Sequence, residues 1–347
     1  MTFSKHSGWL LAALLPLPAL AADAVIYGRM HLSADYLDAR SADEGATISS
    51  NSSRLGFRGD HALSGDLSAI WQVEIEVSAD EGSALSADRN TFGGLRGHWG
   101  ELRAGRFDTP FKLLHNRTSL FADQVGDGRN ILRADVAYND PASADPNWWN
   151  ERLRNSLAWT SPTWQHLTLK AHYSSNQSTS TATASEQASW SGSLEWEQDG
   201  LWLALAHEDS AKVVATAPGL SKRRASRAAM AWQLGDTRVT GLYQLADSPR
   251  VAAWGAGASQ RLTPSLTLKA HYYALDARGA DEDAELMALG FDYTVAKPLM
   301  LYLNYARLWN GDLINRDPWS QGRSDSDLDT LNGESPQAVS AGMIYRF

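Results

Sequence analysis

The stretch VIYGRMHLSADYLD, residues 25–38, decides the fold because its side chains alternate between two kinds. The even positions from Ile26 to Tyr36 are apolar or small, whereas the odd positions from Arg29 to Asp35 are polar. Successive side chains of a β-strand point to opposite faces. The stretch therefore predicts a strand with one apolar face and one hydrated face.

The same alternation returns along the chain and continues to its last residue, most clearly in residues 67–78, 266–274 and 339–347. Short turns and longer polar segments separate such stretches. The short turns contain Gly, Pro or Asp, which suit tight hairpins. We expect short turns at 63–66, 98–101, 161–163, 199–200, 235–236, 263–264 and 297–298, and longer loops at about 39–52, 79–88, 107–153, 175–188, 210–222, 246–250, 276–284 and 310–336.

Seven short turns and eight longer loops join sixteen strands. This asymmetry is typical of bacterial outer-membrane barrels, and the even strand count places both termini on the periplasmic side. Sixteen strands leave an aqueous lumen, whereas eight are filled by side chains. We therefore predict an all-β, 16-stranded antiparallel transmembrane β-barrel. Its strands are expected at about 24–37, 53–61, 67–78, 89–97, 101–106, 154–160, 166–174, 189–198, 201–209, 223–234, 237–245, 251–262, 266–275, 285–294, 299–309 and 337–347.

One of these strands has no assignable facing, because residues 201–206 are apolar at every position.

The first residues have the pattern of a secretory signal peptide. Lys5 precedes an apolar run from Trp9 to Leu20, and small residues at Ala19 and Ala21 form a cleavage site. The run is too short to span a bilayer as a helix, which takes about 20 apolar residues. We expect residues 1–21 to be removed, with cleavage after Ala21 or Ala22, and residues 22–347 to form a single barrel domain.

The composition excludes several other classes of protein. No run of about 18 apolar residues follows the signal, which argues against helical membrane spans. The net charge of −9 argues against nucleic acid as a partner. The 14 Trp and 11 Tyr suit a barrel, whose aromatic rings lie at the two membrane interfaces. A soluble β-sandwich also alternates, but it needs neither the signal nor these aromatic residues.

Several segments resemble the neisserial type of Gram-negative general porin. The resemblance lies in VIYGR at 25–29, NSSRLGFRG at 51–59, GELRAGR at 100–106 with DTP at 108–110, NSLAWTSP at 155–162, and DY at 292–293 followed by LYLNY at 301–305. The terminal Phe347 is similar to the assembly signal of outer-membrane barrels. The resemblance implies a homotrimer in the outer membrane. It also implies a long third loop that folds inward, narrows each pore, and turns its acidic residues toward a basic wall.

Charged side chains at the narrowest point set the ionic selectivity of a pore. The alternation places the arginines of the early strands in the lumen, because a charge that faces lipid near the midplane costs about 2–4 kcal/mol. The expected basic wall of the constriction is Arg29, Arg54, Arg58, Arg103 and Arg106. The expected opposing acids of the third loop are Asp108, Asp123 and Asp127, with Asp135 as a further candidate.

The third loop departs from the enterobacterial pattern, because it lacks a Pro-Glu-Phe-Gly turn. Residues 147–150, Asn-Trp-Trp-Asn, could line a path for sugars or pack against the wall, and packing is favoured. In the last long loop, Asp325, Asp327 and Asp329 have a spacing that can bind a divalent cation. A hydrated outer loop is the simpler interpretation, in which these acids share loosely bound cations with lipopolysaccharide. No other cofactor is expected.

The sequence thus predicts passive diffusion of ions and small hydrophilic solutes through a water-filled barrel. A substrate-specific channel for sugars, organic acids or phosphate is the main alternative, followed by an outer-membrane enzyme or an adhesin barrel. An enzyme is disfavoured because the nine His are scattered and no nucleophile motif stands out. The sequence leaves the choice between anion and cation selectivity open.

Overall fold

The structure is a computed structural model that describes residues 23–40, 44–82, 89–132, 149–175, 188–213, 220–247, 250–277, 281–324, 328 and 330–347. The expected signal peptide, Asp135, and the carboxylates Asp325, Asp327 and Asp329 lie outside these described residues.

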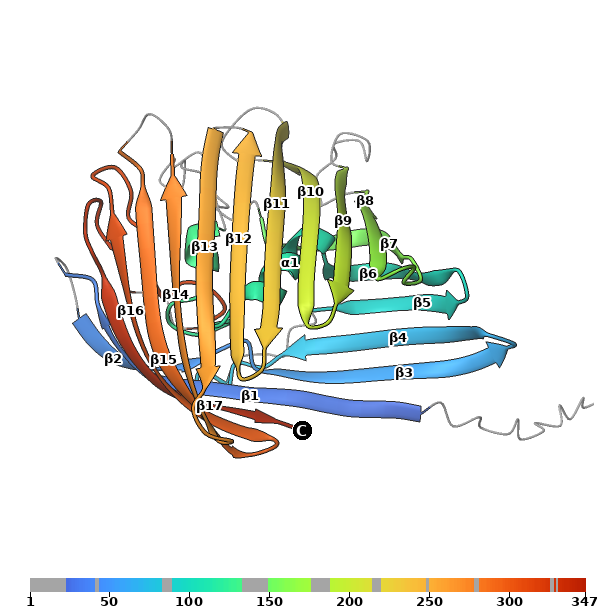
Figure 1. The fold of residues 1–347 in the computed structure, drawn as a ribbon, viewed down its shortest axis with the longest axis horizontal. Coiled ribbons are helices and arrows are strands. Elements are labelled where there is room, and N and C mark those ends of the chain that lie inside the picture. The colour runs from blue at the N-terminus through green and yellow to red at the C-terminus, as the bar shows by residue number, and fades with distance from the viewer. Residues whose placement is uncertain are drawn as a thin grey trace, which may run out of the picture.

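Seventeen strands form one antiparallel sheet that closes on itself (Figure 1). The closure pairs β17 with β1, from Arg29 opposite Arg346 to Asp38 opposite Gln337. The strands are β1 (Asp23–Asp38), β2 (Glu44–Ser50), β3 (Arg54–Ser64), β4 (Leu67–Glu76), β5 (Thr91–Gly97), β6 (Gly100–Asp108), β7 (Arg152–Thr160), β8 (Leu167–Ser174), β9 (Ser189–Gln198), β10 (Leu201–Val213), β11 (Leu220–Leu234), β12 (Thr237–Asp247), β13 (Arg250–Arg261), β14 (Leu266–Asp276), β15 (Ala284–Ala296), β16 (Leu299–Asn310) and β17 (Gln337–Arg346).

Two of these strands, β2 and β3, are halves of one barrel strand, so the barrel has the predicted sixteen. Both pair with β1, β2 along its second half and β3 along its first half. A short break at 51–53 separates them. There the hydroxyl of Ser53 accepts from the backbone N–H of His31 and donates to its carbonyl, at 2.9 and 3.0 Å. These bonds replace the backbone hydrogen bonds that the sheet lacks at the break, and they hold both halves on β1.

The alternation has the predicted outcome, with an apolar outer face and a largely polar inner face. Leu205 of β10 is 62% exposed on the outside, whereas Arg29 and Asp35 of β1 are buried inside. Closure gives β1 and β17 a strand partner on each side, so the described sheet forms a ring, which is the condition for β-structure in a bilayer.

The last residue completes the closure beside the first strand. The backbone N–H of Gly28 donates to the carbonyl of Phe347 at 2.9 Å, and the N–H of Phe347 donates back at 3.2 Å. A Cβ atom on Gly28 would lie only 2.2 Å from the Phe347 ring, so glycine makes room for the ring.

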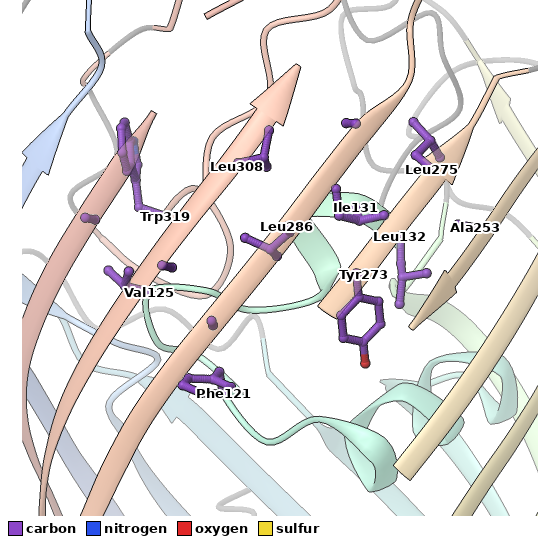
Figure 2. Close-up of a cluster of buried hydrophobic side chains, with 14 of the residues drawn as sticks. Phe121, Val125, Ile131, Leu132, Ala253, Tyr273, Leu275, Leu286, Leu308 and Trp319 are labelled. Atoms are coloured by element: carbon purple, nitrogen blue, oxygen red, sulfur yellow. The ribbon is translucent and has the colours of Figure 1, made fainter. Parts of the chain in front are cut away.

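The third loop folds inward and carries two helices, α1 (Pro110–Thr118) and α2 (Arg129–Leu132). In Figure 1, α1 lies inside the barrel behind β11 and β12. Beyond α1, Phe121, Val125 and Ile131 pack against Tyr273 and Leu286 of the wall (Figure 2). Among the described residues, no helix has the length and apolar character needed to cross a membrane.

The last long loop also turns inward, which the sequence did not indicate. Ile314, Arg316 and Trp319 have no exposed surface. The Arg316 guanidinium donates from Nη1 to the carbonyls of Asn130 and Ile131, at 2.7 and 2.8 Å. The described part of this loop therefore packs on the third loop from Ile314 onward, whereas the three carboxylates for which a hydrated outer loop was expected lie outside the described residues.

All seven short turns lie where they were predicted, but two predicted loops are shorter than expected. β2 occupies half of 39–52, and β10 and β11 extend into 210–222. Strand ends that project beyond the membrane face water on the outside, and they no longer need an apolar face there. When both faces carry polar residues, the sequence no longer alternates between apolar and polar positions, and the strand is not predicted.

Candidate functional site: the pore lining

The predicted basic wall and the predicted loop acids meet at one point, between Arg29 and Asp123. The Arg29 guanidinium contacts the Asp123 carboxylate at 2.6 Å and donates to the carbonyls of Asn51 and Ser52 at 3.0 Å. The split between β2 and β3 presents these carbonyls. Arg29 therefore fastens the tip of the third loop to the wall.

A second arginine, inside the loop, completes this anchor. Arg129 contacts Asp123 at 2.7 Å and Asp127 at 2.6 Å. Burial raises the pKa of Asp123, but Arg129 and Arg29 outweigh it and hold that pKa well below its usual range. The pKa of Asp127 is lowered in the same way, with Arg129 as the main cause against burial. Both acids are charged and directly compensated.

The nearby imidazole of His115 does not add to this compensation. It lies 3.7 Å from Asp127, and burial lowers the pKa of His115 to about 3. The ring is therefore neutral at physiological pH, and the charge of Asp127 is balanced by Arg129.

Asp108, the remaining predicted acid, lies at the end of β6. Its carboxylate contacts Lys112 at 2.8 Å and Arg152 at 2.9 Å, and it accepts from the Asn90 amide at 3.1 Å. The three predicted acids are thus held by four basic side chains, Arg29, Lys112, Arg129 and Arg152. Each of these three carboxylates therefore has at least one basic side chain in contact.

The other predicted arginines lie along β3 and β6. Arg54 is 3.6 Å from Glu74, and Arg103 pairs with Glu101 and lies over the Phe92 ring, 4.4 Å from its centroid. Arg58 lies over the Tyr27 ring at 5.0 Å. Among the described residues, Arg58 has no carboxylate within ion-pair distance. Arg106 lies in β6 opposite Thr91.

Arg58 and Arg103 line a recess of about 480 Å³ on the inner wall. Arg96 joins them there, and Asp60 is the only carboxylate among the described lining residues. Arg96 contacts Asp60 at 2.5 Å. The recess carries more positive than negative side chains. That these arginines line the constriction itself stays a prediction.

Sequence reasoning missed several charged residues of this lining, among them Glu74, Arg89, Arg96 and Arg129. The first three stand on hydrated faces of strands or next to them, so the alternation contained a signal for them. Arg89 contacts Glu74 at 2.6 Å. Arg129 belongs to a loop without periodicity, and only its contacts identify it. Trp149 of the aromatic pair packs against Phe111, as favoured, with ring centroids 5.7 Å apart, and its partner Trp148 lies outside the described residues.

The closed sixteen-strand barrel, its charged interior and its inward third loop define a transmembrane β-barrel pore of the outer membrane. Residues 8–313 match the sequence profile that describes the Gram-negative porins. The chain belongs to the Gram-negative porin family.

Individual relatives and solved structures agree with this assignment. The major outer membrane protein P.IB of Neisseria meningitidis serogroup B is 33% identical over 111 residues, which cover 30% of this chain. The match spans about a third of the length of that protein. Outer membrane porin protein 32 of Delftia acidovorans is 24% identical over 314 residues, 87% of this chain and 86% of that protein.

Among solved structures, an anion-selective porin from Comamonas acidovorans is similar in fold. The TM-score is 0.82 at 22% identity, and the alignment covers 94% of this chain and all of the other. The trimer form of the Vibrio cholerae outer membrane protein OmpT is similar with a TM-score of 0.67 at 17% identity. At these identities the likeness concerns the fold.

Proposed function

We propose that the protein is a passive diffusion channel for ions and small hydrophilic solutes, and that its pore prefers small anions. One observation carries the proposal. The predicted loop acids Asp108, Asp123 and Asp127 are each in contact with a basic side chain, whereas Arg58 has no carboxylate partner among the described residues. The lining therefore has more uncompensated positive charge than uncompensated negative charge. A mobile anion is attracted to it more strongly than a mobile cation.

The physical basis is the field of fixed charges in a narrow aqueous path. Such charges attract counter-ions and repel co-ions, and they do so more strongly where low-dielectric walls focus the field. The net charge of −9 belongs to the whole chain, outer loops included. The sign of the preference depends on the lining alone. The porin of similar fold from Comamonas acidovorans is anion-selective, which supports the same direction.

The test is the reversal potential of the refolded channel under a salt gradient. Replacing Arg58 and Arg103 together by Gln should shift the reversal potential toward cation preference, because two positive charges leave the recess. Arg224→Gln is the control, since Arg224 is exposed on the outer face of β11 beside Asp209. An unchanged reversal potential in the double variant would refute the assignment of the basic wall.

The same recordings separate a general pore from a substrate-specific one. A general pore passes different small anions in proportion to size and charge. Block of the chloride current by micromolar phosphate, a dicarboxylate or a sugar would instead reveal a selective binding site and refute the general-pore proposal.

We also propose that the channel is a homotrimer without enzymatic activity. The family resemblance and the trimer form recorded for the Vibrio protein support the trimer. Chemical cross-linking in outer-membrane fragments should give a ladder that ends at three chains. Hydrolysis of ester or peptide substrates by the purified trimer would contradict the second half of the proposal.

A further inference from the structure

Two separate parts of the third loop meet one arginine of the barrel wall. Arg227 of β11 donates from Nη1 to the carbonyl of Phe111, in the first turn of α1, and to the Oδ1 atom of Asn150, both at 2.9 Å. Its Nε donates to the Oε1 atom of Gln244 on β12 at 3.2 Å. Asn150 lies just before β7, so Arg227 joins the beginning of the loop to its end.

Gln244 and Asn150 extend the contact to a third part of the loop. The Gln244 amide donates to the carbonyl of Leu132, the last residue of α2, at 3.3 Å. The Asn150 amide reaches the same carbonyl at 3.5 Å. We call Arg227, Gln244 and Asn150 the root hub, because they gather the first helix, the second helix and the exit of the loop.

The surroundings of Arg227 make its charge unusual. The side chain is 1% exposed, and it lies in a row where the neighbouring inward positions are Ala225, Ala229 and Ala231. Among the described residues, no carboxylate lies within ion-pair distance of Arg227. Its guanidinium instead stacks on the Phe111 ring, 4.0 Å from the centroid.

A buried charge of this kind persists only where hydrogen bonds and other polar contacts satisfy it. On the wall, the inward row around Arg227 is alanine, and the nearby buried carboxylate of Glu208, opposite Ala225, lies beyond ion-pair distance. Two of the three acceptors of Arg227 belong to the loop, and the third, Gln244, is itself bound to the loop. The reason for a charge here therefore lies in the loop that the charge holds.

We propose that Arg227 is the positioning residue of the pore, which fixes the third loop against β11 and β12 and thereby sets the width of the open channel. It acts without touching solute, because its side chain is buried. The tip of the loop has a separate ionic anchor at Arg29 and Asp123. Loss of the hub therefore frees the root of the loop while the tip remains attached, and the channel fluctuates between conductance levels.

Single-channel recording of Arg227→Met tests this proposal, because Met keeps most of the volume and removes every donor. The fraction of time spent in reduced-conductance levels should rise at least about tenfold, the effect expected when even one hydrogen bond from a charged donor is lost. Arg227→Lys should give an intermediate value, since an ammonium group cannot reproduce the planar fork of donors.

Arg224→Met is the matched control, on the same strand three residues away. Its side chain is 62% exposed on the outer face and pairs with Asp209. It loses the same charge, and its channels should record like the unaltered protein. Arg227→Met channels with the conductance and open-state noise of the unaltered protein would overturn the proposal, even if they unfolded more easily.

A second variant keeps the test decisive if Arg227→Met fails to insert. Asn150→Leu removes the loop side of the hub and leaves the wall intact. It should raise the fraction of reduced-conductance levels in the same direction. In the double variant with Arg227→Lys, the two effects should be less than additive, because both act on one contact. A quiet Asn150→Leu channel would refute the hub.

Discussion

At the scale of single residues, the acids of the third loop act as anchors. Asp123 joins the wall arginine Arg29 to the loop arginine Arg129, and Asp127 holds Arg129 from the other side. A carboxylate in such a place positions the loop and cancels positive charge. It offers little field to a passing ion.

Replacing Asp123 by Asn tests this role, because the amide cannot neutralise Arg29 and Arg129. We expect the reversal potential to move further toward anion preference, and the free energy of unfolding to fall by about 3–5 kcal/mol, as when one partner of a buried pair is removed. Salt-gradient recordings and urea unfolding measure the two effects. Asp199→Asn, at the turn between β9 and β10, should change neither. A shift toward cations would contradict the anchor.

The same carboxylates predict how the pore responds to acid. A carboxyl group whose pKa is lower in the folded chain stabilises the fold above its ordinary pKa, and that contribution is lost as the pH falls through the lowered value. The pKa of Asp123 lies well below its ordinary 3.8, and His115, with a pKa of about 3, stays neutral. We therefore expect unchanged conductance from pH 7 to about pH 4, where the anchor is still charged.

Single-channel recordings across this range provide the measurement, with Asp123→Asn as the comparison at each pH. A step in conductance between pH 7 and pH 5 would show that a titratable group outside this anchor controls the loop, and it would contradict this prediction.

The alternation predicted which arginines of β1 and β3 face inward, because facing depends only on local periodicity. It could not predict that Asp123 would touch Arg29, which is 94 positions away in the sequence. That contact depends on the path of a loop without periodicity. For the same reason, the contacts of Arg129 and Arg227 with the third loop could not be predicted from the sequence.

At the scale of elements, the docking of α1 explains a strand that resisted interpretation. Residues 201–206 are apolar at every position, because the outer face of that part of β10 faces lipid and its inner face packs against α1. Leu203 and Leu205 face outward, whereas Trp202 and Ala204 face inward in the same buried cluster as Phe111 and Leu114 of the α1 helix. The small inward side chains of β10 and β11 leave the space that the helix fills.

Truncating α1 at its buried face should therefore weaken the whole barrel. Leu114→Ala is expected to lower the free energy of unfolding by about 2–5 kcal/mol, because Leu114 has no exposed surface and the cavity cannot fully collapse. Urea unfolding followed by tryptophan fluorescence gives the value. Leu203→Ala, 43% exposed on the outer face of β10, is the matched control and should lose much less. Equal losses would show that the helix docks loosely.

At the scale of the whole molecule, the two ends of the chain close the barrel together. β17 pairs with β1, and Phe347 exchanges two backbone hydrogen bonds with Gly28. A barrel without this closure would expose two strand edges to lipid, where unpaired backbone groups have no water to bind. The closing contact is therefore a condition for folding, and it lies at the end of the last predicted strand, 337–347.

Deleting Phe347 should accordingly lower the yield of refolded barrel more than any loss of side-chain contact explains. The deletion removes the two bonds to Gly28 as well as the ring, whereas Phe347→Ala removes only the ring, which as a cross-strand contact contributes about 1 kcal/mol or less. Folded and unfolded protein separate on an unheated gel, so the yields can be compared directly. Val339→Ala, on the outer face of β17, should refold like the unaltered chain. If the deletion and Phe347→Ala refolded equally well, the ring rather than the backbone pairing would direct closure.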